Sequence, residues 1–135
     1  MGEIKNNAKE PIELFGYECE DGWLPLINEA KEFIDDYNSK NNLEGDDACK
    51  FLQVKEKFGT LTIYCNFYFD GLHEKLAEIE RKSSTICEIC GNNETAKTMP
   101  VHGWIMTLCD ECRKKEEERY RKKYDEYHKK HNQTN

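Results

Sequence analysis

Two Cys-x-x-Cys pairs constrain this chain more than any other feature of its 135 residues. The first pair is Cys87 and Cys90, the second is Cys109 and Cys112, and 18 residues separate the two pairs. Each pair can hold one metal ion from a tight turn, and together they supply four sulfur ligands to a tetrahedral site. Gly91 favours such a turn after the first pair. The spacing therefore predicts a structural zinc ion, Zn²⁺, in a zinc ribbon over residues 85–112.

Four cysteines at this spacing are also compatible with two other chemistries. A thioredoxin-like redox site needs only one Cys-x-x-Cys, so the second matched pair argues against it. An iron centre uses the same four thiolates, and the spacing does not separate iron from zinc. A catalytic zinc needs an open coordination position, which four cysteines do not leave. His102 lies in the spacer and is interpreted as a loop residue rather than a fifth ligand.

The remaining cysteines and the first residues indicate an intracellular chain. The seven cysteines are an odd number, and MGEIKNNAKE lacks the apolar stretch of a secretory signal, so no disulfide framework is expected. Cys19, Cys49 and Cys65 are expected to be small buried apolar residues. The sequence contains no run of about 18 apolar residues. We therefore expect no membrane span and a cytoplasmic location.

Charge is distributed unevenly along a chain whose formal net charge is −7. Residues 1–80 carry 8 basic and 18 acidic side chains, residues 81–112 carry 3 and 4, and residues 113–135 carry 9 and 5. Nucleic acid should repel the acidic first part, whereas the basic end can contact phosphate. A nucleic-acid partner is therefore less expected than a protein partner.

Residues 11–84 are predicted to form an acidic α+β body, preceded by a disordered N-terminus at residues 1–10. From Trp23 to Tyr37, apolar residues recur at three- and four-residue spacing, which predicts a helix. The segment after Asp70, a candidate N-cap, repeats this spacing in a second short helix. With a β-hairpin between the helices, the fold expected is a small helix–hairpin–helix layer followed by the ribbon.

The predicted hairpin has two different faces. Alternation predicts strands over residues 51–58 and 61–69, joined by a type II′ turn at Gly59-Thr60. In this register Lys57 pairs with Thr62 and Lys55 with Tyr64. One face is then apolar and packs against the first helix. The opposite face carries Gln53, Lys55, Lys57, Thr62 and Tyr64.

This polar face is the candidate ligand- or partner-binding surface of the body. The lysines of this face, Lys55 and Lys57, are not needed for the core and can bind phosphate. Tyr64 can stack on a base. Solvation of an exposed sheet face is the simpler role of the same side chains. Trp23 likewise has two interpretations, as a core residue or as the wall of a ligand pocket.

The end of the chain, residues 113–135, is predicted to be one charged helix. Acidic residues precede basic residues by four positions, a spacing that stabilises exposed helices. Tyr120, Tyr124 and Tyr127 form an aromatic stripe. The stripe is expected to dock on the body or on a second copy in a homo-oligomer, with a contact to a partner as the alternative.

Four segments together resemble a family of small phage- and prophage-encoded proteins with a C-terminal four-cysteine zinc ribbon. The segments are DGWLPLI (21–27), QVKEKFGTLTIY (53–64), CEICG (87–91) and GWIMTLCDEC (103–112). The combination is more specific than the cysteine pairs alone and covers residues 21–112. The resemblance implies a phage setting and a host-cell cytoplasm as the location, and it implies no activity.

Two functions from different classes are compatible with these observations. One is a non-enzymatic phage accessory protein that binds and inhibits a host factor or defence component, through a protein surface or by sequestering a signalling nucleotide. The other is a zinc-ribbon regulatory module that associates with nucleic acid through the basic end. An enzyme is not expected, because the sequence shows no nucleophile–base pair, no phosphate-binding glycine loop and no open metal site.

Overall fold

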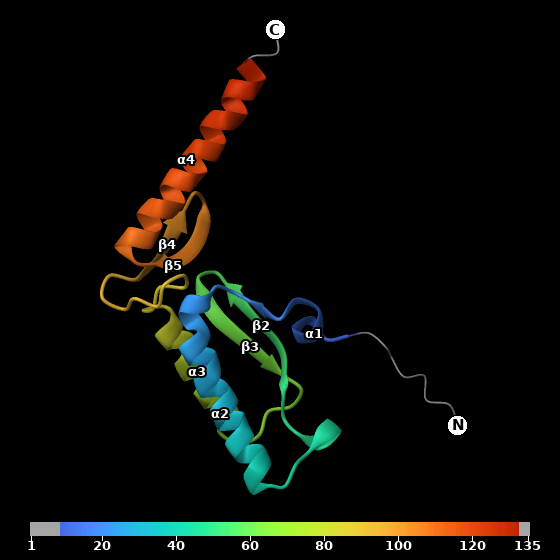
Figure 1. Ribbon diagram of the computed structural model, residues 1–135. Coiled ribbons are helices and arrows are strands. Elements are labelled where there is room, and N and C mark those ends of the chain that lie inside the picture. Colours follow the sequence, from blue (N-terminus) through green and yellow to red (C-terminus); the bar gives the residue numbers. More distant parts are fainter. Residues whose placement is uncertain (1–8, 133–135) are drawn as a thin grey trace.

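The computed structural model describes residues 9–132 and shows an α+β protein with two small sheets and a long C-terminal helix (Figure 1). The elements are α1 (Pro11–Phe15), β1 (Tyr17–Glu18), α2 (Leu24–Lys40), β2 (Phe51–Lys57), β3 (Thr60–Cys65), α3 (Leu72–Ser83), β4 (Lys97–Val101), β5 (Trp104–Leu108) and α4 (Asp110–Asn132), with short 3-10 turns at Asp21–Trp23 and Gly45–Asp47. The predicted α+β class is confirmed. Most of the N-terminus predicted to be disordered, residues 1–8, lies outside the described residues.

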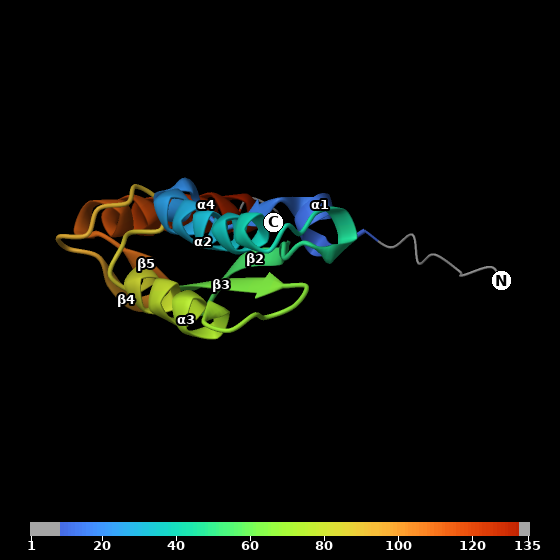
Figure 2. The same ribbon diagram turned by 90° about the horizontal axis from the view of Figure 1, so that it is seen from below.

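The body is a three-stranded sheet with α2 and α3 on one face. Its strand order is β1-β2-β3, with β1 parallel to β2 and β2 antiparallel to β3. Figure 1 shows α2 and α3 along the same side of β2 and β3, and the two helices contact each other. In Figure 2, α2 lies nearer β2 and α3 lies nearer β3. The apolar stripe of α2 packs with Val54, Leu61 and Ile63 of the hairpin and with Ile79 of α3 in one core. The predicted helix cover of the hairpin is therefore present.

Two helix boundaries differ from the sequence prediction. The first helix continues to Lys40, beyond Tyr37. Asp70 does not cap α3, because Gly71 occupies the N-cap position with φ of 93° and the helix begins at Leu72. A left-handed residue is needed where the chain turns into the helix, and glycine adopts it without steric cost.

The hairpin turn lies one residue earlier than predicted. Phe58 and Gly59 form the two-residue turn, with φ of 52° and 84°, which is the pattern of type I′ rather than type II′. The predicted turn at Gly59-Thr60 is therefore wrong. The carboxylate of Glu56 favours the observed turn, because it accepts the N–H of Gly59 at 2.7 Å.

The register of the hairpin moves with the turn, but its two faces do not change. Lys57 pairs with Thr60, and Lys55 pairs with Thr62, so each predicted partner shifts by two residues. Side chains alternate along a strand with period two, so a two-residue shift keeps residues 53–57 and 61–64 on their predicted faces. Only Phe51 changes face within these strands, because an irregularity between Phe51 and Gln53 pairs it with Cys65. The prediction of an apolar and a polar face thus holds although the predicted pairs were wrong.

Residues 11–18 form two elements that the sequence pattern did not predict. Ile12 of α1 packs against the core. Strand β1 pairs Tyr17 with Val54 and Glu18 with Lys55 along the outer side of β2. A helix of five residues and a strand of two are too short for hydrophobic periodicity to detect.

The body contacts the ribbon closely at Gly22 and Trp23. The N–H of Gly22 donates to the carbonyl of Glu88 at 2.7 Å, and the indole N–H of Trp23 donates to the carbonyl of Ile86 at 2.8 Å. A Cβ at Gly22 would overlap the carbonyl oxygens of Cys87 and Glu88. Only glycine permits this approach of two backbones.

A second contact joins the hairpin turn to β5. Thr107 is fully buried, and its hydroxyl donates to the carbonyl of Gly59 at 2.5 Å. The Thr98 hydroxyl lies 2.6 Å from the same oxygen atom of Thr107. Body and ribbon are therefore held against each other at two separate points.

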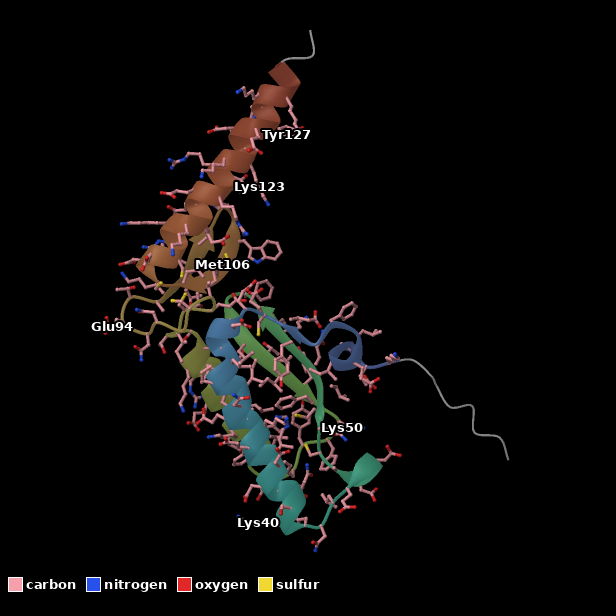
Figure 3. The ribbon with its side chains drawn as sticks, in the orientation of Figure 1. Lys40, Lys50, Glu94, Met106, Lys123 and Tyr127 are labelled. Carbon is pink, nitrogen blue, oxygen red and sulfur yellow. The ribbon has the colours of Figure 1, made fainter. Side chains whose placement is uncertain are left out.

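Helix α4 begins inside the ribbon and projects from it. It starts at Asp110, so Cys112 lies in its first turn, before the predicted start of the charged tail at residue 113. The far half of α4, which carries Lys123 and Tyr127, extends beyond the rest of the molecule (Figures 1 and 3). Among residues 9–132, no helix is apolar and long enough to cross a membrane.

Replacement of Gly22 by alanine should destabilise the protein by about 2–4 kcal/mol, because a Cβ cannot fit against the first cysteine turn. Urea unfolding followed by tryptophan fluorescence measures the change. Asn28→Ala, at an exposed position of α2, is the control and should change the free energy of unfolding by less than about 0.5 kcal/mol. Equal stability of Gly22→Ala and the wild type would contradict the close approach.

Candidate metal centre and hairpin groove

Four cysteine sulfurs form one cluster at the base of α4. The Sγ atoms of Cys87, Cys90, Cys109 and Cys112 all lie within 4.8 Å of one another. The Sγ atoms of Cys90 and Cys109 are 3.6 Å apart. Zinc–sulfur bonds of about 2.3 Å in a tetrahedron place neighbouring sulfurs about 3.8 Å apart. The structure thus brings the predicted ligands together, and the cluster fits a metal ion such as zinc.

A turn, a strand end and a helix start place these sulfurs. Cys87 and Cys90 lie in the turn after α3, where the N–H of Gly91 donates to the carbonyl of Cys87 at 2.9 Å. Gly91 has φ of 82°, as expected for a glycine in a tight turn. Cys109 follows β5, and the N–H of Cys112 donates to its Sγ at 3.4 Å. This N–H directs positive charge at a metal-binding sulfur.

The backbone favours a thiolate at the first ligand. Burial raises the pKa of the Cys87 thiol, but backbone N–H groups, chiefly those of Cys90 and Cys109, outweigh burial and lower the pKa to about 7. Burial raises the pKa of Cys112. Metal binding requires all four thiols to lose their protons, so the affinity of the cluster should fall at acid pH.

The donor set suits a structural rather than a catalytic metal. Four thiolates complete a tetrahedral coordination shell and leave no position for water or substrate. Val101, Leu108 and Met106 pack around the cluster in a separate small apolar core. A metal there would join the first cysteine turn to the end of β5 and the start of α4.

The other three cysteines lie in the body, as apolar residues. Cys49 and Cys65 are buried in the main core, and Cys19 packs at its edge. Burial raises the pKa of both Cys19 and Cys65 to about 12. These thiols are therefore protonated at neutral pH and poor nucleophiles.

Trp23 lies in the core and not in a pocket wall. Its exposed fraction is 0%, and its indole N–H is used by the carbonyl of Ile86. A ligand cannot reach the ring in this conformation. Of the two interpretations of Trp23, the geometry supports the core residue.

The five residues of the predicted polar face lie in three different local environments. Gln53 is half-buried, and its amide donates to the Glu18 carboxylate at 3.2 Å. Thr62 and Tyr64 border a shallow hollow beside α3. Lys55 and Lys57 border a different space, next to the ribbon. The five residues therefore share a sheet face but not one site.

A groove of about 450 Å³ separates the tip of the body hairpin from the tip of the ribbon hairpin. Its lining residues are Lys55, Glu56, Lys57, Phe58, Gly103, Trp104 and Ile105. Phe58 is 71% exposed and Trp104 is 67% exposed. Between residues 9 and 130, neither Lys55 nor Lys57 has a carboxylate within 4.0 Å. Two free cations and two exposed aromatic rings thus meet at one place.

Both hairpin tips use the same strained turn. Phe58 has φ of 52° and His102 has φ of 55°, and a glycine follows each of them. A side chain in this left-handed region costs about 1–2 kcal/mol. The ring of His102 gains a stack on Tyr120, with centroids 3.9 Å apart. In the described part of the chain, no aromatic ring stacks on Phe58.

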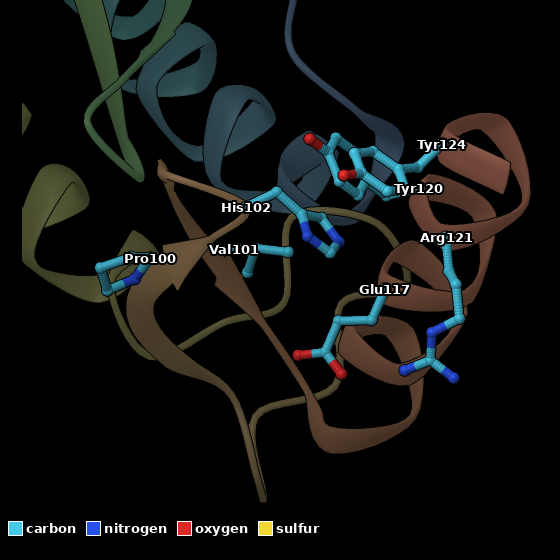
Figure 4. A pocket seen from close by; sticks show the side chains of 7 residues that line it. All are labelled: Pro100, Val101, His102, Glu117, Tyr120, Arg121 and Tyr124. Carbon is cyan, nitrogen blue, oxygen red and sulfur yellow. The ribbon is translucent and has the colours of Figure 1, made fainter. Parts of the chain in front are cut away.

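A second hollow, of about 340 Å³, lies between the ribbon turn and α4. Figure 4 shows the imidazole of His102 beside the rings of Tyr120 and Tyr124, with Glu117 and Arg121 also on α4. The predicted tyrosine stripe is thus partly explained, because Tyr120 docks on the ribbon. Tyr120 and Tyr124 are still 49% and 53% exposed.

Sequence reasoning missed Phe58 and Trp104 as surface residues. Strand alternation alone places Phe58 on the apolar face of the predicted hairpin, and it places Trp104 on the same side of a ribbon strand as Met106 and Leu108. Leu108 is buried and Met106 half-buried, but Trp104 lies at the exposed tip. The sequence signal for these two tips is a ring-bearing residue followed by glycine between two alternating segments. It occurs as Phe58-Gly59 in KFGT and as His102-Gly103 in VHGW.

Comparisons with known proteins assign no family to this chain. No protein-family model matches it. No curated protein and no solved structure matches it at a significant level. The resemblance of the four segments to phage-encoded proteins therefore rests on those segments alone, and inferences about function rest on the geometry.

Removal of the metal should unfold the ribbon and lower the free energy of unfolding by more than about 3 kcal/mol, since metal binding is coupled to folding. Cys109→Ser should lose the metal, while Cys19→Ser, outside the cluster, should keep one ion per chain. Native mass spectrometry counts the ion. X-ray absorption should show four sulfurs at about 2.3 Å for zinc. Full metal content in Cys109→Ser would contradict the assignment of the centre.

Proposed function

We propose that this chain is a non-enzymatic interaction protein in which a structural zinc holds a binding groove in shape. The groove, defined by Lys55, Lys57, Phe58, Trp104 and Ile105, is the observation that carries the proposal. The partner is a host factor or a component of host defence, which the chain binds and inhibits. The resemblance to phage-encoded proteins supports a host component in this role.

The charge of the groove supports binding. Lys75 and Lys82 on α3 each form an ion pair with Glu29 of α2 at 3.1 Å. Between residues 9 and 130, Lys55 and Lys57 have no such partner, as is also true of the exposed Lys31 and Lys50, but only Lys55 and Lys57 lie beside exposed aromatic rings. A partner with complementary negative charge can form ion pairs with such lysines when it covers the adjacent apolar surface.

The aromatic residues support a protein partner over a signalling nucleotide. Trp104 and Phe58 are about two-thirds exposed, whereas small-molecule sites enclose most of the ligand surface in a concave pocket. Exposed aromatic residues next to cations are typical of the anchors of protein interfaces. A nucleotide, with its phosphate on the lysines and its base on Trp104, is the competing ligand.

A closed metal centre supports a function without catalysis. Four sulfurs leave no open coordination position, and the groove contains no thiol or histidine side chain. The zinc has a mechanical role in this proposal. It anchors the end of β5, and β5 carries Trp104 and Ile105 to the groove.

The alternative, a regulatory module that associates with nucleic acid, depends on α4. This alternative is supported by the exposed side chains of Tyr120 and Tyr124, which can stack on bases. Arg121 lines the same hollow. Glu117 lines the same hollow and repels phosphate. The groove at the hairpin tips is therefore the better-supported site.

The double variant Lys55→Glu, Lys57→Glu should weaken partner binding at least about tenfold and leave folding intact. The matched control is Lys31→Glu, Lys50→Glu, which changes the net charge equally at exposed positions of the body. Figure 3 shows Lys50 at the side of the body away from α4. A photo-crosslinker at position 105 identifies the partner in host cells, and calorimetry with the purified pair measures affinity. Equal affinities of the two double variants would remove the groove as the site.

Phe58→Asn should stabilise the protein by about 0.5–1 kcal/mol and weaken partner binding, because asparagine tolerates the left-handed turn but removes the ring. Phe58→Ala is the matched control, since it removes the ring and keeps a strained turn. Both variants should bind alike in calorimetry, and only Phe58→Asn should unfold at higher urea. A Phe58→Asn protein that binds as tightly as the wild type would show that the ring has no role in recognition.

A further inference from the structure

We infer that the groove recognises an extended acidic segment of the partner, with carboxylates at alternate positions and a large apolar residue beside them. This inference rests on the proposed binding function and adds the chemistry of the ligand. It follows from two features of the groove: the spacing of its two lysines and the exposed rings at one end.

The two lysines set the spacing of the complementary charges. Lys55 and Lys57 lie two residues apart on β2 and therefore point to the same side of the sheet. Alternate residues of a strand are about 6.6–6.8 Å apart. In an extended segment of a partner, side chains at alternate positions repeat at the same distance. Carboxylates at positions i and i+2 can therefore meet both lysines, whereas carboxylates at i and i+1 point to opposite sides.

Glu56 lies between the lysines but is directed elsewhere. It belongs to the opposite side of the strand, and its carboxylate accepts the N–H of Gly59. The groove thus carries a formal charge of +1 from Lys55, Lys57 and Glu56, with both free cations on the side open to a ligand. An anionic segment is the complementary ligand on a protein that repels anions over most of its body.

The aromatic tips fix the position of the apolar residue. Phe58 follows Lys57 directly, and Trp104 and Ile105 face it from the ribbon. A large apolar side chain of the ligand, two residues beyond the carboxylate on Lys57, would lie against these residues. The recognised pattern is acid-x-acid-x-apolar, read in the direction that runs from Lys55 towards the turn.

Three fluorescein-labelled twelve-residue peptides in a Ser/Thr background test the pattern with the full-length, metal-loaded protein. The first contains Asp-Thr-Asp-Thr-Leu together with the reverse order, Leu-Thr-Asp-Thr-Asp, so that both chain directions are sampled. The second has the same composition with its aspartates adjacent. The third has lysine in place of aspartate. ATP is tested separately as the probe for nucleotide binding. Fluorescence polarisation measures peptide affinity, calorimetry measures ATP, and amide chemical shifts locate each binding site.

The alternating peptide should bind at least about fivefold more tightly than the adjacent-acid peptide, and the lysine peptide should not bind at about 1 mM. Lys55→Glu, Lys57→Glu should weaken the alternating peptide at least about tenfold, and Lys31→Glu, Lys50→Glu should weaken it less than about twofold. Raised salt should weaken binding, and shifts should be confined to residues 55–58 and 103–105. Trp104→Ser should weaken the alternating peptide without removing its preference over the adjacent-acid peptide.

Equal binding of the alternating and adjacent-acid peptides would overturn the inferred spacing. No peptide binding, or binding of ATP that depends on Lys55 and Lys57, would overturn the acidic segment as the ligand. If the crosslinker at position 105 still captures a partner whose binding needs the two lysines, the proposed function survives that result. If no partner depends on the groove in cells, the proposed function fails together with the inference.

Discussion

The approach of Gly22 to the first cysteine turn is the contact on which the rest of the molecule depends. It places a body backbone directly on the carbonyls of Cys87 and Glu88 and lets Trp23 be buried beneath them. At this contact the main core reaches the cysteine cluster through a glycine and an indole. A chain with 37% hydrophobic residues has a modest core, and a metal bound by the four cysteines at this point would compensate for it.

This contact also explains why a cysteine cluster shapes a groove that it does not touch. The cluster holds the end of β5, and buried Thr107 of β5 is bonded to Gly59 in the turn of the body hairpin. The tips of the two hairpins are thus positioned by the same strand. The distance between Phe58 and Trp104 depends on this packing, which a metal in the cluster would hold in place. Loss of such a metal should therefore disorder the groove before it disorders the main core.

The groove combines features that stability alone would not select. Phe58 occupies a left-handed turn position without burial, and Lys55 and Lys57 have no ion-pair partner in the described part of the chain. Asparagine in the turn and carboxylates near the lysines would each be more stable locally. Residues that lower the stability of the fold and gather at one exposed place are typical of binding surfaces. His102 shows the contrast, because its equally strained position is compensated by the stack on Tyr120.

The local patterns of the sequence were sufficient for the parts of the structure that depend on spacing. The Cys-x-x-Cys pairs predicted the cluster, because four thiolates at that spacing have few other uses. The three-and-four apolar repeat predicted α2, and strand alternation predicted the two hairpin faces. The faces survived an error in the turn because a two-residue shift preserves the side-chain period.

Features that depend on contacts between distant segments came only from the folded chain. No local pattern shows that Gly22 meets Cys87 and Glu88, or that Trp104 faces Lys57 across a groove. Each of these joins residues whose neighbourhood is created by packing body against ribbon. The sequence determined which side chains share a face, because that follows from backbone periods of 2 and 3.6 residues, and which can hold a metal, because that follows from the Cys-x-x-Cys spacing. The fold settled which faces meet, because that depends on the shape of the whole core.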